Sequence, residues 1–153
     1  MTNLSRFARW QPAAALALMI AVSAGCSTMQ GAMGTMGIMG ATKVTLSGAE
    51  EVPAVSTAAA GSGTIVVSSD KSVSGSVKTS GLTGTMAHIH EAAAGKNGPV
   101  IVPLTQSEDG VWSVPAGAKL TDAQYESFKA GNLYVNVHSA ANKGGEIRGQ
   151  LKP

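Results

Sequence analysis

The sequence predicts an all-β fold of the β-sandwich type, with one short helix. Two observations support this fold class. From residue 42 onward, short runs of β-branched and small residues alternate with turn residues, as in GTIVV at 63–67 followed by SSDK. Aromatic residues make up only 4% of the chain while Gly, Ala, Ser, Thr and Val dominate, which suits short strands and a thin core. Such regular short strands with polar turns are typical of immunoglobulin-like or Greek-key sandwiches.

Each element follows from local sequence. The expected strands are residues 44–46, 63–67, 73–77, 86–90, 100–104, 111–114, 133–138 and 146–151. One helix is expected over residues 122–130, because Thr121 is a good N-cap and Asp122 lies in the first turn. Gly131 follows at the position where a left-handed residue ends many helices.

The first 25 residues are expected to be a signal peptide of the lipoprotein type. Residues 1–12 carry Arg6 and Arg9 without an acid, and residues 13–24 are an apolar run too short to span a bilayer comfortably. Small residues then precede Cys26, as in a bacterial lipobox. We expect lipidation of Cys26, which anchors the protein to a membrane in the periplasm or at the cell surface. The alternative is cleavage after Ala24, which releases a soluble secreted protein.

Residues 26–41 are expected to form a flexible tether before the domain at 42–153. Glycine and methionine alternate there without helical or strand periodicity. Met29, Met33, Met36 and Met39 offer soft thioether ligands that suit Cu(I), so they are candidate auxiliary ligands. Methionine also serves simply as an apolar filler residue in a tether close to lipid. Both interpretations of these four methionines, soft ligands or apolar filler, stay open.

Composition excludes several classes of function. Removing Arg6 and Arg9 with the leader leaves nine cationic residues against nine acidic ones, without a basic cluster, which argues against a nucleic-acid partner. A single cysteine permits no disulfide within the chain. The sequence has no Gly-x-Ser-x-Gly elbow and no phosphate-binding glycine loop, so hydrolase and nucleotide-binding functions have no support. We expect no enzymatic activity.

The chain's three histidines are the candidate metal ligands. Side chains alternate along a strand, so His88 and His90 share one face while Ile89 faces the core. By the same rule His138 lies opposite the core-facing Val137. Three imidazoles with an open fourth position suit copper, and zinc less well.

Met86 lies on the face of His88 and is the preferred extra ligand. Glu91, Asn136 and Glu146 are candidate partners that would fix a histidine tautomer. The alternative is architectural, with the histidines bridging strands and loops by hydrogen bonds. The His-x-His strand also faintly resembles copper/zinc superoxide dismutase, but the further histidines, aspartate and disulfide of that enzyme are missing.

Several motifs in order resemble the CHRD domain, named for repeats in chordin. They are SGAEEVPAV at 47–55, AHIH at 87–90, GKNGPV at 95–100, GNLYVNVH at 131–138 and GEIRGQL at 145–151. The resemblance implies an all-β extracellular module and, from the chordin context, protein binding; it implies no reaction. We therefore expect an exported binding module for copper, with a protein-interaction or structural module of the cell envelope as the alternative.

Overall fold

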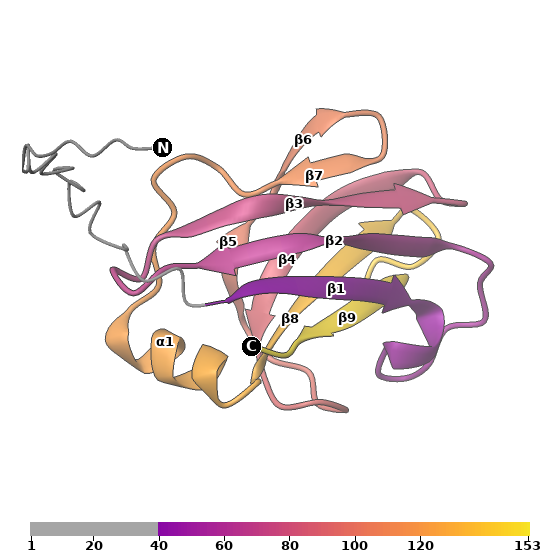
Figure 1. Ribbon diagram of the computed structural model, residues 1–153. Coiled ribbons are helices and arrows are strands. Elements are labelled where there is room, and N and C mark those ends of the chain that lie inside the picture. Colours follow the sequence, from indigo (N-terminus) through magenta and orange to yellow (C-terminus); the bar gives the residue numbers. More distant parts are fainter. Residues whose placement is uncertain (1–39) are drawn as a thin grey trace, which may run out of the picture. The chain divides into compact units, whose positions relative to one another are not determined.

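The computed structural model describes residues 40–153, and it confirms the all-β fold with one short α-helix (Figure 1). The strands are β1 (Ala41–Ser47), β2 (Ala60–Val67), β3 (Val73–Ser80), β4 (Gly84–Glu91), β5 (Val100–Pro103), β6 (Thr105–Glu108), β7 (Val111–Ser113), β8 (Leu133–Ser139) and β9 (Ile147–Leu151). The helices are the 3₁₀ helix η1 (Gly48–Glu50) and α1 (Asp122–Lys129). The expected signal peptide, Cys26 and the four methionines of the tether lie outside the described residues.

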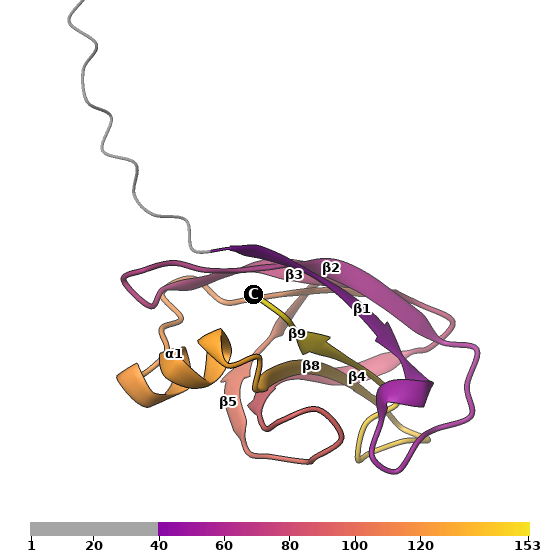
Figure 2. The same cartoon turned by 60° about the horizontal axis from the view of Figure 1, so that its bottom comes forward.

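The strands form one sheet that folds over on itself into two layers. Its order is β5-β4-β8-β9-β1-β2-β3-β7-β6, and each strand runs antiparallel to its neighbours in this order. Figure 2 shows β1, β2 and β3 in one layer and β4, β8 and β9 in the other. The two ends of this order, β5 and β6, are successive in the chain with only Leu104 between them. The Leu104 amide donates to the Ala87 carbonyl at 2.9 Å, so the sheet is nearly closed.

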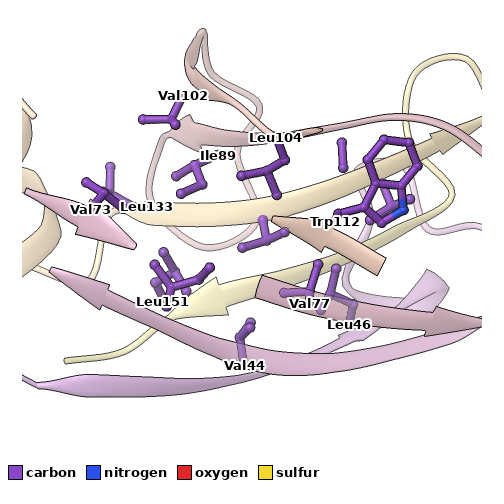
Figure 3. Packing of buried hydrophobic residues seen from close by; sticks show 14 of the residues in the cluster. Val44, Leu46, Val73, Val77, Ile89, Val102, Leu104, Trp112, Leu133 and Leu151 are labelled. Atoms are coloured by element: carbon purple, nitrogen blue, oxygen red, sulfur yellow. The ribbon is translucent and has the colours of Figure 1, made fainter. Parts of the chain in front are cut away.

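Alternation of side chains places the core between these layers. Leu133, Val135 and Val137 on β8 are fully buried and face inward, as the sequence predicts. Figure 3 shows the packing of core residues from both layers, among them Ile89 from β4 and Val77 from β3. Burial of these side chains is the main stabilising contribution to the fold.

Helix α1 confirms the predicted N-cap and first residue, and it ends at Lys129, one residue before the predicted end. The Thr121 hydroxyl accepts from the Gln124 amide, and the Gln124 side chain accepts in return from the Thr121 amide, which is a capping box. Phe128 is the buried residue of the helix and joins the core.

The sequence does not predict two of the elements, β6 and η1. Strand β6 is exposed at all four positions and therefore lacks an apolar alternation; it pairs with β7 across the turn that contains Gly110, whose φ is 67°. Helix η1 is a single turn without a side-chain cap. Strand β1 begins at Ala41, one residue before the expected start of the domain.

Within residues 40–153, no helix is long and apolar enough to cross a membrane.

Candidate metal site

The outer face of the β4-β8-β9 layer is polar yet largely buried. Across it, Met86 lies opposite His138, His88 opposite Asn136, and His90 opposite Tyr134. Residues of β8 on this face are as buried as those facing the core, because loops cover them. Figure 2 shows loops from η1, from β4–β5 and from β8–β9 on the side of this layer that faces away from β1–β3.

The three histidines converge on one place, as the sequence predicts. One nitrogen from each of His88, His90 and His138 lies within 4.8 Å of the others. The ring centroids are 4.9 Å apart for His88 and His138, 5.5 Å for His88 and His90, and 6.1 Å for His90 and His138. Metal–nitrogen bonds of about 2.0–2.1 Å require nitrogens no more than about 4 Å apart, so small side-chain shifts complete a three-nitrogen site.

Backbone hydrogen bonds fix the tautomer of His90. Its Nδ1 lies 3.0 Å from the Gly98 carbonyl, which only accepts, so Nδ1 carries the proton. Its Nε2 is then a bare lone pair, and this atom is buried without a hydrogen-bond partner. A metal ion would satisfy this nitrogen, since imidazole binds metals through its unprotonated nitrogen.

A hydrogen bond to a backbone carbonyl fixes the tautomer of His138 in the same way. Its Nδ1 donates to the Lys143 carbonyl at 3.0 Å, which leaves Nε2 as the acceptor. That Nε2 lies 3.1 Å from Nδ1 of His88, so in the metal-free domain His88 donates to His138. His88 is only half-buried, whereas His90 and His138 are buried, so His88 is the ligand that is free to rearrange when a metal enters.

Burial favours the neutral form of His88 and His90. Burial lowers the pKa of His88, and the neighbouring His138 and His90 rings lower this pKa further. Burial also lowers the pKa of His90, against a smaller opposing effect of its bond to Gly98. Neutral imidazole is the form that binds metal, so both shifts favour a ligand.

Tyr134 positions His90. The two rings stack with centroids 4.8 Å apart and planes 10° from parallel. The Tyr134 hydroxyl accepts from the Gly98 amide at 3.2 Å, so it holds the residue whose carbonyl fixes His90. The guanidinium of Arg148, which is 1% exposed, lies 3.4 Å from the Tyr134 ring centroid. Such outer partners orient metal ligands.

The predicted partners of the histidines are wrong. Glu91 accepts from Ser127 on α1, and Glu146 accepts from Thr57. Asn136 donates to Glu51 at 3.2 Å. The tautomers are fixed by backbone carbonyls, and a carbonyl in a loop leaves no residue-type signal in the sequence.

Met86 lies on the histidine face, on β4, and is 50% exposed. Its role as a ligand stays a prediction. The turn at 95–99 flanks the histidines, because its Gly98 contacts His90.

The CHRD domain profile matches residues 42–151. The chain belongs to the CHRD domain family. The match covers β2 to β9 in full, β1 except its first residue, and all three histidines. Comparisons with curated proteins and with solved structures gave no match.

Proposed function

We propose that this CHRD domain is a non-enzymatic copper-binding module, exported and anchored to a membrane through a lipid on Cys26. His88, His90 and His138 hold the ion, with Met86 as a fourth ligand and the methionines of residues 26–41 as an auxiliary soft site. Its role is sequestration or transfer of copper in the periplasm or at the cell surface.

The observation that carries the proposal is the buried Nε2 of His90. The Nε2 atom of His90 is buried without a partner, which costs roughly 1–3 kcal/mol, and such atoms are few in folded proteins. This nitrogen belongs to the group of three that lie within 4.8 Å of one another. His138 also presents an unprotonated nitrogen to the group, because its other nitrogen donates to a carbonyl.

The donor set favours copper. In the described residues the cluster contains imidazole nitrogens without a carboxylate, so hard cations such as Mg²⁺ and Ca²⁺ fit it poorly. Copper(II) binds nitrogen sites more tightly than the other divalent metals of its row, and Cu(I) adds affinity for thioethers. Zinc is the second choice.

A second candidate is a protein-interaction or structural module of the envelope. The bond between His88 and His138, with the two bonds to loop carbonyls, favours it, because these link strands and loops without a metal. In that case the histidines are architectural.

Titration separates the two functions. Residues 40–153 would be titrated with Cu(II), and with Cu(I) under reducing conditions, beside a His88→Ala/His138→Ala variant. One tight equivalent that disappears in the variant supports the copper module. Binding no stronger than in the variant, together with a large loss of stability in the variant, supports the architectural role.

A further inference from the structure

A buried carboxyl group lies beside the histidine cluster. Glu51, immediately after η1, is 6% exposed and lies against the outer face of β8. Its Oε2 accepts from the Asn136 amide nitrogen at 3.2 Å. Asn136 lies directly opposite His88 and two residues before His138, on the same face of the sheet.

Two oxygens of this pair have no donor. Oε1 of Glu51 and Oδ1 of Asn136 are both buried and both lack a hydrogen-bond partner. They face the same small space beside Gly145, since a Cβ on that glycine would lie 2.7 Å from Oε1 and 2.6 Å from Oδ1. Two buried acceptors that border the same small space without a hydrogen-bond donor are unfavourable.

A proton on Glu51 removes this mismatch. A carboxylic acid has one O–H donor, so Oε1 then donates to Oδ1 while Oε2 continues to accept from the amide nitrogen. The acid and the amide would then form a closed pair with two hydrogen bonds, which would satisfy both oxygens that now lack a partner.

The surroundings agree with this assignment. Burial raises the pKa of Glu51, and this effect prevails over the lowering by the Asn136 bond, the Arg148 guanidinium and the Val52 amide. No ion pair involves Arg148 among residues 40–153, so Glu51 is not held as a carboxylate by direct contact with it.

The pKa of the neighbouring Glu146 shifts in the opposite direction. Hydrogen bonds from Ser139 and then Thr57 lower its pKa, so it stays a carboxylate. Further charged and titratable groups on the surrounding elements are Glu50 in η1, Lys96 in the loop at 92–99, Lys143 in the β8–β9 loop and the three histidines. A cation on these histidines adds positive charge near Glu51, which favours its ionised form.

We propose that Glu51 is a carboxylic acid in the metal-free domain, paired with the Asn136 amide, and becomes a carboxylate counter-charge when a cation occupies the histidine site. The O–H bond of Glu51 breaks on metal binding, and its proton passes to the solvent. The proposal rests on the proposed metal function and adds that binding is coupled to the release of one proton.

The matched variants are Glu51→Gln and Glu50→Gln. Glutamine keeps the shape of the acid and donates from its amide to Oδ1 of Asn136, but it has no proton to release. Glu50 is the adjacent, exposed glutamate and serves as control.

The first measurement uses the metal-free protein. Carbon-13 NMR of the glutamate carboxyl carbons, followed against pH, is expected to show one glutamate that titrates above the usual value of about 4.3 and is absent from Glu51→Gln. Titration of Glu51 at or below the usual value would overturn the acid pair.

The second measurement counts protons released on Cu(II) binding, by calorimetry in two buffers of different ionisation enthalpy. At a pH about one unit below the measured midpoint, the protein and Glu50→Gln are expected to release nearly one proton more than Glu51→Gln. Methionines in the tether carry no proton and do not disturb the count. We also expect Glu51→Gln to bind Cu(II) about 10-fold more weakly above the midpoint.

The outcomes separate the two claims. Equal proton release by the protein and Glu51→Gln overturns the coupling while copper binding stands. Absence of copper binding overturns the proposed function and the coupling with it, while the NMR titration still decides whether Glu51 is an acid in the folded domain.

Discussion

The two ring nitrogens of His90 have different surroundings, and this difference defines the site at the scale of the residue. One nitrogen donates to the Gly98 carbonyl, and the other is buried without a partner. The sequence predicts that His88, His90 and His138 share a face, because that follows from the two-residue period of a strand. It does not predict the carbonyls that fix their tautomers or the pairing of Glu51 with Asn136, because these depend on how loops fold back over the sheet.

The lowered pKa of His90 predicts how the metal-free domain responds to acid. A histidine with a lowered folded-state pKa stabilises the fold above its unfolded value of about 6.5, and this contribution is lost as pH falls through the folded value. The free energy of unfolding of the protein, relative to His90→Gln, is therefore expected to be larger at about pH 7.5 than at about pH 5. Denaturant unfolding of both proteins at the two pH values, with a chelator present, measures this difference in free energy. An equal difference at both pH values would contradict the neutral, buried ring.

Tyr134 offers a second test at this scale. Tyr134→Phe keeps the ring stacked on His90 but leaves the half-buried Gly98 amide without its acceptor. We expect a loss of about 1–3 kcal/mol in the free energy of unfolding and a roughly 10-fold weaker copper affinity. The control is Tyr125→Phe on α1, because the Tyr125 hydroxyl makes no hydrogen bond in the described part of the chain. For this control we expect no change in the free energy of unfolding or in the copper affinity. Unchanged copper affinity in Tyr134→Phe would show that Gly98 needs no support from the hydroxyl.

At the scale of the element, strands with an apolar alternation are predictable and the segments between them are not. The core-facing residues of β8 and the capped helix α1 follow from sequence, whereas β6 is exposed throughout and pairs with β7 only because the intervening turn folds it there. The histidine site depends on the segments between the strands. The loop at 92–99 supplies the Gly98 carbonyl, and its Asn97 donates to the Val52 carbonyl in the segment after η1 at 2.7 Å.

The close approach of Gly98 tests this dependence on the loop. A Cβ at this position would lie 1.9 Å from the Glu91 carbonyl oxygen, so Gly98→Ala must shift the loop. We expect a loss of about 1–3 kcal/mol in stability and a 10–100-fold weaker copper affinity, since the carbonyl that holds His90 moves. Gly144→Ala is the matched control, because a Cβ there meets no atom within 4 Å. Equal copper affinities for the two variants would contradict the role of the loop.

At the scale of the whole molecule, the nearly closed sheet separates two buried faces. One holds the hydrophobic core between the layers, and the other holds the polar cluster under the loops. A sheet whose ends meet at Leu104 leaves few unpaired strand edges that could pair with another chain. The sequence predicts the strands but not this closure, which requires one continuous segment to pair with β4 and then with β7.

The anchor is a prediction at the same scale. If Cys26 carries the lipid, Cys26→Ser is expected to move the protein from the membrane fraction to the soluble fraction and to remove the added mass of the lipid. Cell fractionation and mass spectrometry of the intact chain measure both. The same fractionation and mass for the two proteins would instead support cleavage after Ala24.

The central claim is that the three histidines bind copper directly, and pulsed electron paramagnetic resonance of Cu(II)-loaded residues 40–153 tests it most directly. We expect couplings from imidazole nitrogens of more than one histidine, lost in the His88→Ala/His138→Ala variant. Copper spectra without imidazole couplings, or couplings that persist unchanged in the variant, would contradict a three-histidine copper site.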